Sequence, residues 1–349
     1  MVLGIETSCD ETAVAILDDG HILANVLDSQ IDMHARYGGV VPELASRRHM
    51  ECIEHLTKEA LDLAKVSLSQ LTGIAVTNRP GLVGALLIGV NFAKALAYAT
   101  NLPCVTVNHL EGHLASAWLA NPNLSSPTMV LIASGGHTHL ALVPHQGEYR
   151  FIGWTMDDAA GEAFDKGAKM LGLSYPGGPA IDKLAEKGNA QFVSFPRPNI
   201  HSQNFNFSFS GLKTALRYFL RDEQQKGNLS LPIADVAASY QEAIVEVLVE
   251  KLCRAARKYN VKAISVVGGV AANSRLRVKL EERAHTLGLE VTLPPRALCT
   301  DNAAMIAAAG LKKLRCQEKT AWDMDAISTL QFKHDGSDMA GIRSPLNIL

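Results

Sequence analysis

Several features are scarce in this chain of 349 residues. It has only six cysteines and no C-x-x-C pair, which disfavours a disulfide framework or a zinc knuckle and fits the reduced thiols of the cytoplasm. Aromatic residues make up only 6%, so we expect a core of Ala, Val, Leu and Ile. With 47% hydrophobic and 19% charged residues, disorder is excluded as the main state.

A targeting signal and a long apolar run are also missing from the pattern. The N-terminus has no basic segment, and Glu6 and Asp10 interrupt its apolar residues, so we expect no signal peptide. The most apolar stretch, 81–93, is shorter than the roughly 20 residues of a membrane span and is expected to be a buried helix. We therefore expect a cytoplasmic protein with no membrane partner.

Neither sign of charge dominates. Lys and Arg number 33 against 35 Asp and Glu, giving a net charge of −2. This balance disfavours a protein that binds nucleic acid through bulk charge alone.

The order of apolar and polar segments predicts an α/β protein. Strand, polar turn and strand follow one another over 2–17 and again over 129–143, which suggests a duplicated core. Asp235 is the expected N-cap of a helix that ends near Asn260. The remaining predicted strands are 73–77, 104–107 and 263–267, and the remaining predicted helices are 42–63, 82–99, one from about 110, and 303–311.

The sharpest motif is His109-Leu-Glu-Gly-His113. On a helix, residues i and i+4 project to one side, so both imidazoles can face one metal ion. The other interpretation is two hydrogen-bonded histidines at a strand–helix junction. Glu111 is at i+2, away from the side that the two histidines share, which disfavours the general base of a zinc protease.

A third ligand must come from elsewhere, and Asp301 precedes an apolar helix. It is either a ligand or the N-cap of that helix. Two His and one carboxylate would suit Fe(II) or Zn(II) and leave positions open for a substrate oxygen.

Glycine-rich and hydroxyl-rich turns form the second set of candidates. Backbone N–H groups of 134–137 can surround an anion, and Thr7, Ser8 and Thr12 can act similarly beside Asp10 or Glu11. The Gly268-Gly269 turn leaves room for a flat base. Asp165 and Asp182 lie near further Gly turns, as ribose ligands or as solvated helix charges. Together these features indicate a nucleotide bound between two lobes.

The motifs as a set closely resemble the TsaD family, the tRNA N6-adenosine threonylcarbamoyltransferases once mislabelled as sialoglycoprotein endopeptidases. The resemblance covers about residues 2–312. The motifs that carry it are Gly4–Thr12, Gly38–Glu43, His109–His113, Ser134–Thr138, Gly161–Lys166, Phe207–Thr214, Gly268–Asn273 and Cys299–Asn302.

The resemblance implies an α/β fold with two ribonuclease-H-like domains of the actin, sugar kinase and Hsp70 ATPase superfamily around a nucleotide cleft. We place the N-terminal lobe at 1–127, the C-terminal lobe at 128–315 and a variable tail at 316–349. The family commonly has a second Gly before its Pro-Gly-Leu turn, where this chain has Arg79, so a close backbone approach is not expected at that residue.

The resemblance also implies the site. One divalent metal, Fe(II) in preference to Zn(II), would be held by His109, His113 and Asp301. The implied substrates are tRNA and threonylcarbamoyl-AMP, the implied partners are TsaB and TsaE, and Asp10 and Glu11 are the candidates for a base. The residues implied to bind the adenylate are Ile132, Ala133, Ser134, Gly135, Gly136, Asp165, Gly178, Asp182 and Asn273.

Three other functions fit part of the pattern. A kinase or ATPase of the same superfamily would explain the turns but not the His pair with Asp301, and a metalloprotease is disfavoured by the place of Glu111. A non-catalytic scaffold would not need an intact ligand set.

The net charge of −2 leads to a first prediction. If an anionic tRNA is the substrate, it must be held by local basic surfaces such as Arg47-Arg48, or Arg275, Arg277, Lys279 and Arg283, and by partners. We expect the lone chain to bind tRNA weakly and with strong salt dependence in a filter-binding titration. Tight binding that does not change with salt would contradict this expectation.

Overall fold

A computed structural model describes residues 1–227, 230–317 and 322–329. The chain divides into two compact units, one made of 1–122 with the described residues from 300 onward, and one made of 123–299. Unit 1 contains β1 (Val2–Glu6), β2 (Glu11–Asp18), β3 (His21–Ser29), α1 (Ile31–Ala35), α2 (Pro42–Ala64), β4 (Gly73–Arg79), α3 (Val83–Thr100), β5 (Cys104–Asn108), α4 (His109–Ala120) and α10 (Ala303–Arg315). Unit 2 contains β6 (Thr128–Ala133), β7 (Thr138–His145), β8 (Glu148–Trp154), α5 (Ala160–Met170), α6 (Gly177–Ala185), α7 (Ser210–Gln225), α8 (Ile233–Lys258), β9 (Ala263–Val267), α9 (Ser274–Leu287) and β10 (Glu290–Thr292). Short 3₁₀ turns cover Leu68–Gln70, Gly269–Ala272 and Arg296–Leu298.

The two sheets have the same topology, which confirms the duplicated core predicted from the sequence. Their strand orders are β3-β2-β1-β4-β5 and β8-β7-β6-β9-β10. In each, the first three strands are antiparallel neighbours and the last two add in parallel. An α/β fold with two such sheets confirms the predicted fold class.

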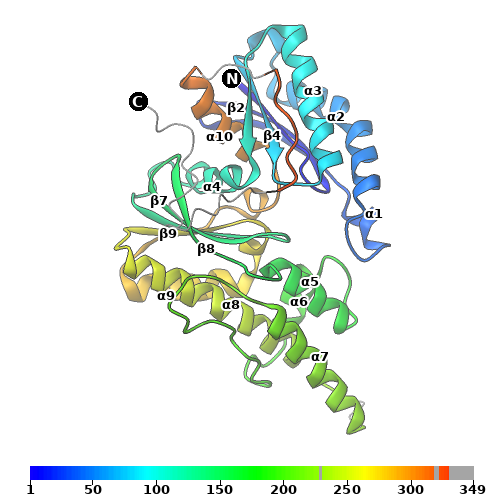
Figure 1. Cartoon of the computed structure of the whole chain (residues 1–349), viewed down its shortest axis with the longest axis vertical. Coiled ribbons are helices and arrows are strands. Elements are labelled where there is room, and N and C mark those ends of the chain that lie inside the picture. Colours follow the sequence, from blue (N-terminus) through cyan, green and yellow to red (C-terminus); the bar gives the residue numbers. More distant parts are fainter. Residues whose placement is uncertain (228–229, 318–321, 330–349) are drawn as a thin grey trace. The chain divides into compact units, whose positions relative to one another are not determined.

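Alternating side chains of the first sheet pack against two different layers of helices, one on each face. Leu3 and Ile5 of β1 belong to a core cluster that includes residues of α2 and α3. Val2 and Ala75 instead belong to the cluster formed with α10. α2 and α3 lie side by side in unit 1 (Figure 1) and contact each other. The period of two along β1 thus gives the sheet a helical layer on each face.

The contacts divide the chain differently from the lobes expected from the sequence. α10 lies within 300–315, which we had assigned to the second lobe, yet it packs on β1, β2, β4 and α4 of unit 1. Met324, within the expected tail, also joins the core of unit 1, and the Ile327 N–H donates to Asn78 O over 2.8 Å. Residues 318–321 and 330–349 of that tail lie outside the described residues.

Two local expectations need comment. α8 begins at Ile233 after Pro232, so Asp235 is in the first turn of the helix and is not its N-cap. α3 spans 18 residues and is apolar and long enough to cross a membrane. One face of α3, including Leu86, Val90 and Ala97, is buried, as in a helix that packs on a sheet.

A tight helix-to-sheet contact generates a stability prediction. A Cβ built on Gly310 of α10 would overlap the Cβ of Ala75 on β4. We expect Gly310→Ala to lower the free energy of unfolding by about 1–3 kcal/mol, because overpacking forces the helix off the sheet.

Gly211→Ala is the matched control. Gly211 is in α7, where the nearest atom to an added Cβ is 3.9 Å away. Since Ala has the higher helix propensity, this variant should be neutral or stabilised by up to about 1 kcal/mol. Urea titrations followed by circular dichroism measure both, and equal midpoints would contradict the packing argument.

Candidate metal centre and nucleotide-binding turns

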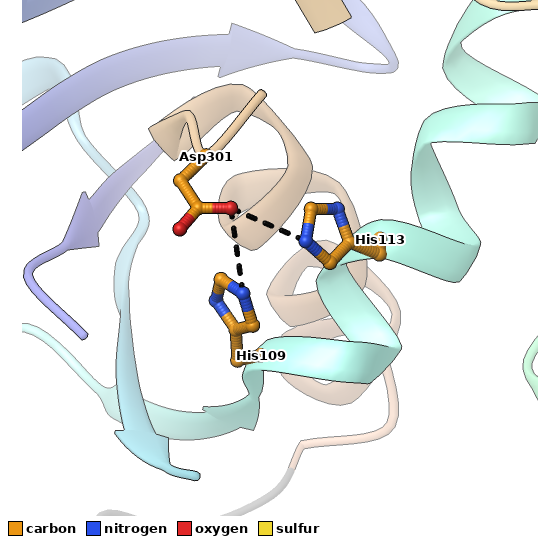
Figure 2. A group of neighbouring side chains, drawn as sticks. All are labelled: His109, His113 and Asp301. Atoms are coloured by element: carbon orange, nitrogen blue, oxygen red, sulfur yellow. Dashed lines mark ion pairs between the residues drawn. The ribbon is translucent and has the colours of Figure 1, made fainter. Parts of the chain in front are cut away.

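Both histidines of the His109–His113 motif come from the first turns of α4. β5 ends at Asn108, whose side chain accepts from the Leu110 N–H over 2.9 Å and caps the helix. His109 is therefore the first residue of α4, and His113 lies one turn later on the same side (Figure 2). Their ring centroids are 4.6 Å apart, and both side chains are buried.

Asp301 completes the cluster from a distant part of the chain. One of its oxygens, Oδ1, lies 3.4 Å from His109 Nε2 and 3.2 Å from His113 Nε2 (Figure 2). The N-cap of α10 is the next residue, Asn302, whose Oδ1 accepts from the Met305 N–H over 3.0 Å. The alternative that Asp301 itself caps the helix is therefore wrong, and its carboxylate faces the two histidines.

The arrangement fits a metal ion. Ligand atoms about 2.1 Å from a tetrahedral metal lie about 3.4 Å from one another. The Asp301–His separations match this value, and one potential ligand atom from each of the three residues lies within 4.8 Å of the others. Within the described residues, neither ring nitrogen of His113 makes a hydrogen bond although both are buried. A metal ion bound to one of these nitrogens would offset the free-energy cost of burying it without a hydrogen bond.

A fourth residue, Glu6, orients His109. Its Oε2 lies 3.1 Å from His109 Nδ1 and accepts from the Thr77 hydroxyl over 2.7 Å. The Ser8 N–H donates to the other oxygen, Oε1, over 2.6 Å. A proton on Nδ1 directs the free electron pair of Nε2 toward Asp301, as in carboxylate–histidine–metal triads.

The protonation states follow from burial and charge. Burial acts to lower the pKa of His109, but the carboxylates of Asp301 and Glu6 raise it to about 9. Burial acts to raise the pKa of Glu6, yet attraction to His109 and its hydrogen bonds leave it lowered. Burial lowers the pKa of His113, which keeps that imidazole neutral and able to act as a ligand. Positive charge is therefore favoured between these carboxylates.

Glu111 has a structural role. Its carboxylate lies 3.3 Å from Lys313 Nζ of α10, and the same ammonium donates to Thr106 O over 2.9 Å. This largely buried ion pair joins α4 to α10. Its pairing with Lys313 agrees with the prediction that Glu111 is not the general base of a protease.

Asp10 and Glu11 precede and begin β2 in unit 1. Asp10 O accepts from the Gln30 N–H over 3.1 Å. Burial, and then the charges of Asp301 and Asp10, raise the pKa of Glu11 to about 10. Glu11 thus holds a proton at neutral pH unless positive charge is added near Asp301, so its use as a base stays a prediction.

In unit 2, the turn 134–136 joins β6 to β7, and an added Cβ on Gly135 or Gly136 would meet nothing within 4 Å. Ile132 and Ala133 are the buried last residues of β6. The Gly161 N–H of α5 donates to Ser134 O over 3.1 Å, which seats the start of α5 under the turn. Gly268, with φ +91°, lies against Ala133 O, where only glycine fits. The turn therefore presents open backbone, as an anion site requires.

The other predicted adenylate residues adjoin this turn through helices of unit 2. Asp165 on α5 accepts from the Gly177 N–H over 2.7 Å, directly beside Gly178, at which an added Cβ would meet nothing within 4 Å. Asp182 on α6 accepts from the Ser274 N–H through Oδ2 over 2.9 Å, while its buried Oδ1 has no hydrogen-bond partner in the described residues.

Asn273 is held by its own structural contacts. Its side-chain oxygen caps α9 at the Leu276 N–H over 2.9 Å, and its Nδ2 donates to Gln241 over 2.8 Å. Its backbone is used as well, since its N–H donates to Val270 O over 3.0 Å and its carbonyl accepts from the Arg277 N–H over 3.2 Å. Both the side chain and the backbone of Asn273 therefore serve the fold, and its contact with the adenylate stays a prediction.

The close backbone approach questioned at Arg79 occurs two residues later. The Leu82 N–H donates to Ser8 O over 2.8 Å, and an added Cβ on Gly81 would overlap that oxygen. Arg79 itself ends β4, paired with Asn108 of β5. The larger side chain thus does not obstruct the turn.

The basic surfaces expected to hold tRNA are mostly neutralised by acids. Arg48 pairs with Asp28 over 2.8 Å. Arg275 and Lys279 share Glu242, and Arg283 lies 2.9 Å from Glu250. Arg277 donates to the backbone oxygens of Ala271 and Pro294. Arg47 is exposed on α2. The run of cations along α9 thus offers less positive surface than its sequence suggests.

Sequence reasoning missed Glu6 and Thr77. Glu6 was noted only as a break in an apolar segment, and its partner Thr77 is 71 residues away. The available signal was the unusual place of a carboxylate at the end of a fully buried strand.

The Glu6 contacts predict a change in metal affinity. We expect Glu6→Gln to weaken Zn(II) binding by about 10–100-fold, because the amide cannot stabilise the ligating form of His109 as a carboxylate does. Competition with a chromophoric chelator measures the affinity. Glu54→Gln, an exposed carboxyl on α2 paired with Lys58, is the control and should bind like the parent protein. Equal affinity of both variants, with both folded by circular dichroism, would refute the role of Glu6.

Comparisons with known proteins identify the family of the chain. The family model of tRNA N6-adenosine threonylcarbamoyltransferase matches residues 21–308. Proteins of that name are 49% identical in Thermosipho africanus, over 95% of this chain and all of the relative, and 53% identical in an Anaeromyxobacter species, over 93% and 98%.

Among solved structures, HypF from T. kodakarensis covers 90% of this chain and 47% of its own, with a TM-score of 0.60 and 14% identity. Component A of a 2-hydroxyglutaryl-CoA dehydratase from Acidaminococcus fermentans covers 90% and 98%, with a TM-score of 0.53 and 19% identity. At these identities the likeness concerns the fold alone. The family model and the close relatives show that the chain belongs to the TsaD family of tRNA N6-adenosine threonylcarbamoyltransferases and is a transferase that modifies tRNA.

Proposed function

We propose that this enzyme transfers the threonylcarbamoyl group from threonylcarbamoyl-AMP to N6 of the adenosine 3′ of the anticodon, in tRNAs that read codons beginning with A. The observation that carries the proposal is the intact set of His109, His113 and Asp301 in ligand geometry. A kinase or ATPase of the same fold has no need for such a set.

The reaction is an acyl transfer from a mixed anhydride. The N6 nitrogen of adenosine attacks the carbamoyl carbon, the bond from that carbon to the phosphate oxygen breaks, and AMP leaves with the electron pair. N6 loses a proton as the new C–N bond forms. Because AMP is a good leaving group, the protein contributes chiefly by holding the two substrates in line.

The residues of unit 2 suit the adenylate. The backbone of 134–136 is open to a phosphate, and Asp182 Oδ1 is a buried acceptor that a ribose hydroxyl would satisfy. Asp165 holds Gly177 and thereby shapes the backbone at Gly178. These groups bind and orient, and they need not change protonation state during the reaction.

In unit 1, His109, His113 and Asp301 would hold one divalent metal, Fe(II) in preference to Zn(II), with Glu6 orienting His109. When bound, such an ion supplies positive charge for acyl-phosphate oxygens. Asp10 and Glu11 are the candidates to accept the N6 proton. We further propose TsaB and TsaE as partners and a cytoplasmic location, which six scattered cysteines without a C-x-x-C pair support.

Reconstitution tests the proposed function. We expect the chain, with its partners, a threonylcarbamoyl-AMP source and unmodified tRNA, to form the modified nucleoside detected by mass spectrometry. His113→Ala should lower the rate at least a hundredfold, since it removes a metal ligand. His55→Ala, an exposed histidine of α2, should retain full activity.

Two results would count against the proposal. No product from the complete system, under conditions in which a relative is active, would refute the transfer reaction. Full activity of a folded His113→Ala variant would refute the role of the metal site.

A further inference from the structure

A cluster of cations on unit 2 has no part in the site described above. It consists of the cations Arg150 on β8 and Lys251, Arg254 and Lys258 on α8, together with the rings of Phe205 and Tyr259. Arg150, Arg254 and Lys258 lie over these two rings, and Lys251 lies over the neighbouring ring of Phe207. Arg150 lies 5.3 Å from the Tyr259 centroid. Arg254 and Lys258 lie 5.4 and 5.3 Å from the Phe205 centroid. We call these six residues the cation–aromatic cluster.

The four cations of the cluster form no ion pair with any carboxylate in the described part of the chain. The cations of α9 in the same unit do the opposite, since Arg275 and Lys279 both pair with Glu242. Burial, and then the charge of Arg254, lower the pKa of Lys251 to about 8. That effect of Arg254 is what an uncompensated positive field produces.

Hydrogen bonds and ring contacts hold the side chains of the cluster in place. Arg254 donates to the backbone oxygens of Ile200 and Asn204 over 2.8 and 2.9 Å, and buried Lys251 donates to the Ser202 hydroxyl over 3.1 Å. These bonds hold the segment that presents Phe205. The ring faces then restrain the exposed cations Arg150 and Lys258 by cation–π attraction.

The end of α8 explains only part of the cluster. Cations in the last turn of a helix are stabilised by the helix dipole, which accounts for Lys258. Arg150 comes from β8, the edge strand of the sheet, and gains nothing from that dipole. Repulsion between Arg150 and the cations of α8 destabilises the fold, because none of the described acids pairs with them. A bound anion would remove that repulsion.

We propose that the cation–aromatic cluster binds the phosphate backbone of the tRNA. Naming the polyanion as tRNA rests on the proposed function, while the demand for a polyanion rests on the cluster alone. A chain of net charge −2 whose α9 cations are paired needs another positive surface for RNA, and this cluster supplies one. An acidic protein segment is the alternative occupant.

Filter binding of an unmodified tRNA transcript to the full chain, across 50–200 mM salt and without activated substrate, tests the proposal. Arg150→Gln with Lys258→Gln should weaken binding roughly tenfold at low salt and reduce the slope of log affinity against log salt by about 1.5. Arg150→Lys with Lys258→Arg should restore both values, because charge is retained. Lys169→Gln with Lys187→Gln removes two exposed, unpaired cations elsewhere in unit 2 and should leave the slope unchanged.

Two outcomes of the filter-binding experiment would overturn the proposal. If both Gln pairs weakened tRNA binding equally, the binding would depend on the overall charge of the chain and not on the cluster. Unchanged tRNA binding together with lost binding of polyglutamate would assign the cluster to an acidic protein segment. The transferase assay is separate: failure to form product would refute the proposed function and leave the binding result standing. With active enzyme, the cluster pair should raise KM for tRNA and leave kcat unchanged.

Discussion

The close packing of α10 on the first sheet is the constraint on which the candidate metal site depends. An added Cβ on Gly4 would overlap Ala303 O, and one on Gly112 of α4 would overlap Ile306. These small residues let the helix approach both β1 and α4. Asp301, just before α10, thereby reaches the imidazoles of His109 and His113, about 190 residues earlier in the chain. The Lys313–Glu111 pair fixes the far end of the same helix.

The carboxylates beside His109 leave an excess of negative charge unless a cation lies between them. Glu6 and Asp301 flank His109, and both carboxylates raise its pKa. Partial burial, and then the charge of Asp301, raise the pKa of Glu11. Carboxylates grouped in this way stabilise a positive charge between them, whether that charge is a proton on His109 or a metal ion. The hydrogen bonds from Thr77 and Ser8 keep Glu6 in place for either.

The sequence predicted the parts of this arrangement that depend on local pattern. The helical spacing of His109 and His113, the strands and the repeated sheet all follow from periodicity, and the structure confirms them. The choice between Asp301 as a cap and as a ligand depended on one residue, because Asn302 caps equally well. Which sheet α10 would join, and that Glu6 would meet His109, depend on tertiary contacts that no local pattern encodes. The cations of α9 were misjudged because their acid partners are on α8, more than thirty residues away.

The duplicated topology explains why two different sites arise from one plan. Glu6 ends β1, and the Ser134–Gly136 turn follows β6, the equivalent strand of the second sheet. Parallel strands of an α/β sheet bring their carboxyl ends to one edge, which is where ligands bind. In unit 1 that edge carries buried carboxylate and imidazole side chains, which suit a cation. In unit 2 it carries the exposed glycines Gly135 and Gly136, whose open backbone suits a phosphate. The two halves therefore share a backbone topology, while the residues at their strand ends suit charges of opposite sign.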